Sequence, residues 1–138
     1  MNSNFAEISP GRTATVRSTV SQSNTAKTVG SGSMDVFATP MMIALMEQAA
    51  CECLAACLKP EQTSVGTKIN VTHTAASPLG EKITATAVIE SVDGRRIEFA
   101  VSASDSKGEI GRGSHTRVLV NQDEFLERFK ATVSAGGG

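Results

Sequence analysis

The chain has 138 residues, a net charge of −1 from thirteen basic and fourteen acidic side chains, and 40% hydrophobic residues. This length and composition predict one folded domain over residues 1–138, with flexible ends at about 1–9 and 134–138. The balanced charge and the scarcity of aromatic residues argue against nucleic-acid binding, which needs a basic patch or aromatic side chains on which bases stack.

The sequence shows no targeting or membrane segment. The N-terminus lacks a charged region followed by an apolar stretch, which a secretory signal requires. The longest apolar run, residues 36–58, contains two glutamates, and these make a membrane span costly. We therefore expect a cytoplasmic protein that does not bind a membrane.

Three cysteines lie within seven residues of one another, at Cys51, Cys53 and Cys57. An odd number of cysteines in one short apolar stretch does not suggest a disulfide framework. A zinc site would need further ligands, and the chain has only two histidines. We interpret the cysteines as small core residues and expect neither a metal nor another cofactor.

Hydrophobic periodicity predicts a strand, a long helix, an antiparallel meander of four strands and a short helix, in that order. The Ser- and Gly-rich stretch 21–35 is expected to be a loop, and Asp93-Gly94 a two-residue hairpin turn. The last helix begins at Asp123 and carries Phe125 and Phe129 on one face. This order predicts an α+β fold in which one apolar helix packs against one antiparallel sheet. The expected strands are Arg12–Val20, Val65–His73, Glu81–Val92, Arg95–Asp105 and Ile110–Val120.

The long helix is expected from Thr39 to Leu58. Thr39 is a suitable N-cap, and Pro40 suits the first helical position because its missing N–H has no partner there. Pro60 disfavours the helical conformation at Lys59 and so predicts the end of the helix.

Glu47 lies in the middle of an apolar arc of this helix, whereas Glu52 falls on the polar side. A buried carboxylate without a partner costs several kcal/mol or takes up a proton. Glu47 is therefore either a nucleophile or general base, or a structural residue paired with a buried arginine or a backbone amide. Its apolar neighbours on the helical wheel are Ile43, Ala44, Ala50, Cys51, Leu54 and Leu58.

His73 shares one face of its predicted strand with Val65, Thr67, Ile69 and Val71. A histidine on such a face is either a core residue with satisfied hydrogen bonds or a catalytic group. The pattern alone leaves both interpretations open.

Several motifs occur together and in order along residues 10–130. The Ala-Thr-Pro helix start with Glu47 eight residues later, Val-Gly-Thr at 65–67 and Val-x-His at 71–73 form a fairly specific set. In these motifs the chain resembles the hotdog-fold thioesterases of the fluoroacetyl-CoA thioesterase type. The similar segments are Val36–Ala50, Ser64–Thr67, Val71–His73, Val92–Arg96, Ala103–Asp105 and Gly111–Arg117.

The resemblance implies a hotdog fold, with a long central helix wrapped by a curved antiparallel β-sheet and two subunits paired edge to edge. It matches Thr39, Glu47 and His73 to the family's catalytic residues. It matches Gly66 to the glycine whose backbone N–H faces the thioester carbonyl, and it places Arg117 near the coenzyme A side. The acyl-CoA sites would lie at the interface of a homodimer, or of a dimer of dimers.

The implied function is hydrolysis of a small acyl-CoA thioester, in which Glu47 attacks the acyl carbon or deprotonates a water molecule. The alternatives are a thioesterase acting on an acyl carrier protein and a non-catalytic acyl-CoA-binding module. The fluoroacetyl-specific enzyme has a phenylalanine lid before its helix, but residues 30–35 here contain no aromatic residue, so its selectivity is not carried over. Thr39 and Glu47 lie about 12 Å apart along an ideal helix and are not expected to touch.

Overall fold

The computed structural model describes the backbone of residues 6–137 and the side chains of residues 6–130. Five strands form one antiparallel sheet in the order β1-β3-β4-β5-β2. The strands are β1 (Thr13–Thr19), β2 (Gln62–His73), β3 (Lys82–Asp93), β4 (Arg96–Asp105) and β5 (Gly108–Asn121). The helices are α1 (Ala26–Val29), α2 (Thr39–Ala55) and α3 (Gln122–Gly137). The predicted α+β class is confirmed.

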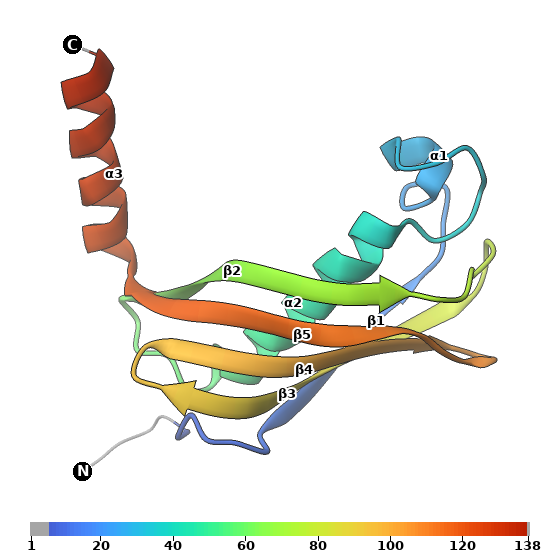
Figure 1. Ribbon diagram of the computed structural model, residues 1–138, viewed down its shortest axis with the longest axis horizontal. Helices are drawn as coiled ribbons and strands as arrows, with labels where there is room; N and C mark the ends of the chain where they lie inside the picture. The colour runs from blue at the N-terminus through green and yellow to red at the C-terminus, as the bar shows by residue number, and fades with distance from the viewer. Residues whose placement is uncertain (1–5, 138) are drawn as a thin grey trace.

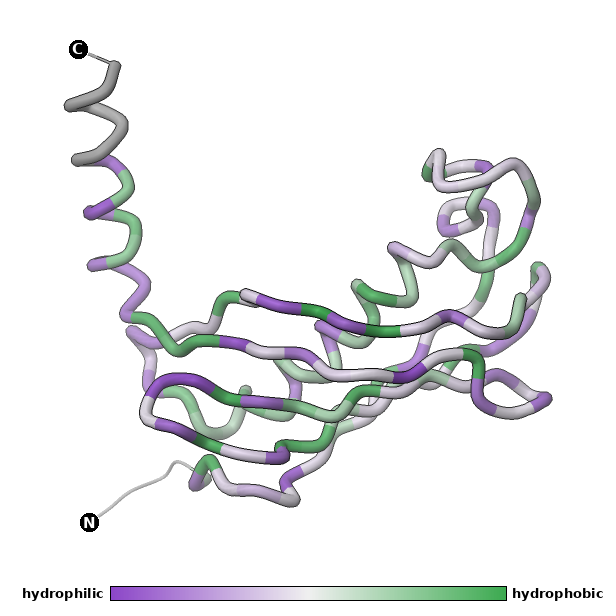
Figure 2. The backbone as a smooth tube through the Cα atoms, viewed as in Figure 1, coloured by the Kyte–Doolittle hydropathy of each residue, from purple (hydrophilic) through white to green (hydrophobic). Residues whose placement is uncertain are grey.

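Helix α2 lies across one face of the sheet (Figure 1). Buried and more exposed residues alternate along β3 and β4, because successive side chains of a strand point to opposite faces. The buried residues of these strands pack against the buried residues of α2. Figure 2 shows much of the α2 backbone in the colours of hydrophobic residues. The core contains Met42, Met46 and Leu54 from α2 and Ile83, Ile89, Ile97 and Phe99 from the sheet.

The start of α2 differs from the prediction by one residue. Ala38 is the N-cap, so Thr39 is the first helical residue and Pro40 the second. No side chain caps this end, because the N-cap is an alanine, and the Thr39 hydroxyl is hydrogen bonded to His73. The hydroxyl thus makes its contact with strand β2 rather than within the helix.

The end of α2 comes three residues before the predicted one, at Ala55 rather than Leu58. The N–H of Cys57 donates to the carbonyl of Leu54 at 2.8 Å, a tighter turn than the α-helix makes. Residues 56–61 therefore connect α2 to β2 as a turn, and Pro60 lies well beyond the helix.

Two short-range predictions differ from the structure. Stretch 21–35 contains the short helix α1, whose N-cap Thr25 accepts a hydrogen bond from the N–H of Thr28. The β3–β4 hairpin pairs Asp93 with Arg96, so its turn residues are Gly94 and Arg95, one position later than expected. Gly94 has φ 61°, a conformation that glycine adopts without strain and that suits a turn with glycine at its first central position.

The predicted flexible ends lie partly outside the described residues. Residues 1–5 and 138 are not described, whereas the N–H of Ala6 donates to the carbonyl of Ala56 at 2.9 Å and Ile8 packs against the core. Helix α3 begins one residue before the predicted Asp123 and runs to Gly137. It stands away from the sheet (Figure 1), and its aromatic side chains Phe125 and Phe129 are exposed.

Strand β2 forms one edge of the sheet and, among the described residues, pairs only with β5. Its register with β5 shifts between Gly66 and Lys68, so Thr67 is the extra residue of a β-bulge. The bulge breaks the single period-two face predicted for this strand. Thr67 and Lys68 are both exposed, and Ile69 is exposed rather than core-facing.

Candidate active site

Glu47 projects from the middle of α2 toward β5 and β2. Its Oε2 accepts a hydrogen bond from Nη1 of Arg117 at 3.3 Å and lies 3.7 Å from Nε2 of His115. The side chain of Glu47 is 41% exposed, whereas those of Arg117 and His115 are 8% and 1% exposed. The expected burial of Glu47 is therefore not found in this chain. A buried guanidinium holds one carboxylate oxygen, and the group still reaches the surface.

Arg117 orients this carboxylate through a network on β2 and β5. Its Nε donates to Oγ of Ser64 at 2.8 Å, and its Nη2 donates to the Ser64 carbonyl at 3.1 Å. Its Nη1 is shared between Glu47 and Nε2 of His115, the latter at 3.1 Å. The guanidinium is thus buried and directed at Glu47. Its predicted place on the coenzyme A side stays a prediction.

The contact with Arg117 determines the proton positions on His115. An arginine can only donate, so Nε2 of His115 accepts, and Nδ1 carries the proton that it donates to the carbonyl of Lys68 at 2.7 Å. Burial lowers the pKa of His115 most, the hydrogen bond to the Lys68 carbonyl opposes this shift in part, and the Arg117 charge lowers the pKa further. His115 is therefore neutral at pH 7.

Gly66 lies directly against the Glu47 carboxylate. A Cβ atom at this position would come within 2.6 Å of Oε2 of Glu47 and within 3.2 Å of Nη1 of Arg117. Only glycine leaves the space that the carboxylate occupies. Gly66 also borders the bulge of β2, whose outer edge pairs with no other described strand.

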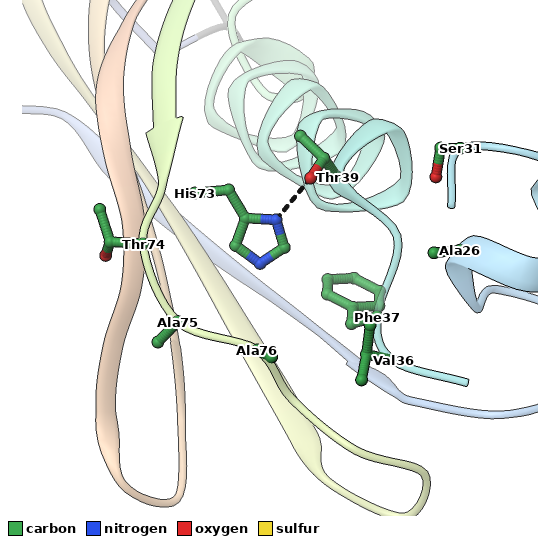
Figure 3. Close-up of a pocket in the computed structure, with 9 residues that line it drawn as sticks. All are labelled: Ala26, Ser31, Val36, Phe37, Thr39, His73, Thr74, Ala75 and Ala76. Carbon is green, nitrogen blue, oxygen red and sulfur yellow. Dashed lines mark hydrogen bonds between the residues drawn. The ribbon is translucent and has the colours of Figure 1, made fainter. Parts of the chain in front are cut away.

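Thr39 and His73 form a second pair, at the start of α2 and the end of β2 (Figure 3). Oγ1 of Thr39 and Nδ1 of His73 are hydrogen bonded at 2.8 Å. Burial lowers the pKa of His73, and a backbone contact with Ala75 opposes this shift in part. Among the described residues, Nε2 of His73 is the buried side-chain polar atom that lacks a hydrogen-bond partner. The hydrogen-bonding capacity of this nitrogen is therefore unused in the chain.

The structure brings the predicted residues together in two groups rather than one. Glu47, Gly66 and Arg117 form the first, and Thr39 and His73 the second. The expectation that Thr39 and Glu47 do not touch agrees with these separate contacts. Within the described residues, no cluster of three or more His, Cys, Asp and Glu side chains is placed to hold a metal ion.

Sequence reasoning missed Ser64 and His115. His115 and Arg117 are two residues apart on β5 and therefore point to the same face of the sheet. That spacing was visible in the sequence and could have identified His115. Ser64 gave no such signal, because its contact with Arg117 depends on the register between β2 and β5.

A long helix packed across a five-stranded antiparallel sheet defines the hotdog class. A hot-dog-like protein from Thermanaerovibrio acidaminovorans superposes with a TM-score of 0.82 and 28% identity, covering 89% of this chain and 91% of that one.

Residues 20–123 match the family described as fluoroacetyl-CoA-specific thioesterase. The fluoroacetyl-CoA thioesterase of Streptantibioticus cattleyicolor is 44% identical over 102 residues, which are 74% of this chain and 73% of that protein. A variant of the fluoroacetyl-CoA-specific thioesterase, crystallised with fluoroacetate and CoA, superposes with a TM-score of 0.81 and 38% identity, covering 86% of this chain and 99% of that one. The chain belongs to this thioesterase family, which confirms the resemblance.

Proposed function

We propose that this protein hydrolyses an acyl-CoA thioester to a free acid and coenzyme A, with Glu47 as nucleophile or general base. The observation that carries the proposal is the Glu47 carboxylate, which a buried arginine orients beside Gly66 and which remains open to the surface. A carboxylate held by a strong donor on one oxygen keeps a fixed direction for attack. Family membership supports the same chemistry.

The reaction has two possible first steps. As a nucleophile, Glu47 forms a bond to the acyl carbon, the carbon–sulfur bond breaks, and water then hydrolyses the mixed anhydride. As a general base, Glu47 takes a proton from water while the hydroxide attacks the same carbon. In both routes the N–H of Gly66 donates to the developing oxyanion. Thr39 and His73 position the reacting groups, and the departing thiolate takes its proton from solvent water.

Coenzyme A is the expected carrier because a relative was crystallised with fluoroacetate and CoA. Its phosphates need cationic side chains at the surface. Arg95, Arg96 and Arg112 are exposed, although Arg96 and Arg112 also form ion pairs with nearby carboxylates. Such exposed pairs are weak and easily exchanged for a phosphate contact.

We propose that the protein works as a homodimer or a dimer of dimers. The twelve-residue strand β2 has no partner on its outer side in one protomer, and unpaired strand edges favour pairing with another chain. The active-site glycine lies on this same edge. A second copy paired along β2 would therefore complete the sheet and enclose the site.

We also propose a cytoplasmic location. Cys51, Cys53 and Cys57 are all free thiols, which suits a reducing compartment. No helix among the described residues is long and apolar enough to cross a membrane.

The test is a thiol-release assay with a panel of acyl-CoA thioesters. Glu47→Ala should lower kcat about 1,000-fold or more, since acid–base groups contribute about 100- to 10,000-fold. Glu47→Gln keeps the shape of the side chain but removes the base, and it should accumulate bound substrate. Glu52→Gln is the matched control, because Glu52 is exposed on the same helix.

Turnover by Glu47→Ala at the wild-type rate would show that Glu47 is structural. Wild-type protein that binds acyl-CoA without hydrolysing it would instead indicate a non-catalytic binding module. An acyl carrier protein thioester belongs in the same panel, because hydrolysis of that substrate alone would reassign the carrier.

A further inference from the structure

A pocket opens beside the Thr39–His73 pair, and its lining bears on the acyl group of the substrate (Figure 3). It has a volume of about 240 Å³ and lies between the start of α2, the end of β2 and the α1 region. Thr39 and His73 form part of its wall. A thioester held by these residues would place its acyl group here.

The outer wall of the pocket consists of small side chains. Ala26 and Ser31 lie on one side and Ala75 and Ala76 on the other, as Figure 3 shows. Phe37 supplies an apolar surface between them. No large side chain of the described residues closes the space from the α1 side.

None of the described residues that line the pocket is an aspartate, glutamate, lysine or arginine. A charged group placed there would find no ion-pair partner among these side chains. The lining thus discriminates against acyl groups that carry a second carboxylate. It offers hydrophobic contact to an uncharged chain.

His73 supplies a polar atom beside this pocket, whose lining mixes uncharged polar and apolar side chains. Its Nε2 is buried without a partner and, in Figure 3, points away from Thr39 toward the space between Phe37 and Ala76. This part of the chain thus combines one nitrogen with unused hydrogen-bonding capacity and a pocket lined by uncharged side chains. An acyl thioester matches this combination, with one carbonyl oxygen and a hydrocarbon group.

The volume of the pocket limits the size of the acyl group that it can hold. A cavity of about 150 Å³ lined by apolar side chains is large enough to bind benzene. The pocket here, at about 240 Å³, exceeds that value and is far larger than a two-carbon group requires.

Resting on the thioesterase function proposed above, we infer that the preferred substrates carry an uncharged apolar acyl group larger than acetyl, up to a benzoyl ring. Ser31 and Ala76 are the residues whose small size admits it. They act as specificity-determining residues, because they limit the space for the acyl group without contacting the reacting carbon.

The experiment measures kcat/KM for acetyl-, isobutyryl-, benzoyl- and succinyl-CoA in the thiol-release assay. Wild-type protein should favour isobutyryl- or benzoyl-CoA over acetyl-CoA by at least tenfold, and over succinyl-CoA by more. Ala76→Leu and Ser31→Leu fill the pocket and should lower the benzoyl-to-acetyl ratio at least tenfold. Ala55→Leu is the matched control, since Ala55 is an exposed alanine of α2 that lines no pocket.

Two results would overturn the inference: succinyl-CoA hydrolysed as well as the apolar substrates, or a benzoyl-to-acetyl ratio that Ala76→Leu and Ser31→Leu leave unchanged. Both require measurable hydrolysis and so leave the thioesterase function standing. Absence of hydrolysis for every thioester, acetyl-CoA included, is the separate result that removes the proposed function itself.

Discussion

The position of Glu47 depends on one guanidinium rather than on an apolar surrounding. Arg117 holds Oε2, Ser64 holds Arg117, and His115 accepts from the same guanidinium. An arginine buried without acceptors would be strongly destabilising, so the network is needed by the fold as well as by the site. The structural and the catalytic interpretation of Glu47 therefore do not exclude each other.

Gly66 gives the most local test of this arrangement. Gly66→Ala places a methyl group within 2.6 Å of the Glu47 carboxylate, which must then rotate away from Arg117 or from the surface. We expect kcat/KM to fall about 100-fold or more, because misplacement of a reacting group by about 1 Å has that cost. Asn70→Ala, at an exposed position of the same strand, should keep the wild-type rate. Equal rates for the two variants would contradict the assigned contact.

The two histidines predict how stability changes with pH. Burial lowers the pKa of both His73 and His115 below 6.5 in the folded protein, whereas the unfolded chain binds these protons near pH 6.5. The unfolded state therefore holds more protons at mildly acidic pH, and stability rises with pH. Their contribution is complete above about pH 7 and is lost as the pH falls below about 6.5.

Urea unfolding between pH 5 and 7.5 measures this change. The free energy of unfolding should decrease toward pH 5, and His115→Gln should reduce the slope. The hydrogen bond from Ser77 lowers the pKa of Asp105 below 3.8. Protonation of Asp105 therefore changes stability only below this pH range and does not contribute to the measured slope. A free energy of unfolding that stays constant or increases toward pH 5 would refute the assignment.

At the scale of elements, hydrophobic periodicity predicted the helix and strands that form the core, but not the features that depend on how the strands pair. The apolar pattern of α2 and the alternation in β3 and β4 were sufficient to place the core. The bulge in β2 was not predictable, because Thr67 becomes the extra residue only through the register with β5. The same register brings Ser64 to Arg117, which explains why that half of the site was incomplete in the sequence analysis.

The β2–β5 pairing has its own sensitive position at Gly113. A Cβ atom here would collide with the carbonyl oxygen of Asn70 and with the backbone of Val71. Gly113→Ala should therefore lower the free energy of unfolding by about 3 kcal/mol, in the range of severe backbone and overpacking substitutions. Ser114→Ala changes an exposed neighbour on the same strand and should cost less than about 0.5 kcal/mol. Urea unfolding of the pair checks this, and equal midpoints would contradict the strand contact.

For the whole molecule, the homodimer proposed above predicts a site shared between protomers if two β2 edges pair with each other. Gly66, beside Glu47, and His73 are seven residues apart on β2, about 23 Å along a strand. If two β2 edges pair antiparallel about their midpoint, Gly66 of one protomer lies about four residues, or about 13 Å, from the level of His73 in the other. Glu47 would then act with the Thr39–His73 pair of the second protomer.

Mixing two inactive variants distinguishes a shared site from a self-contained one. If the sites are shared, a heterodimer of Glu47→Ala and His73→Ala carries both substitutions in one of its two sites. Its other site is intact. Random exchange of protomers should then restore about a quarter of the wild-type activity, because half of the dimers are mixed and each mixed dimer has one intact site of two. Each variant alone provides the inactive control, and light scattering confirms the dimers. If mixing restores no activity although exchange is demonstrated, Glu47 and His73 act within one protomer, and the pairing along β2 must serve stability rather than catalysis.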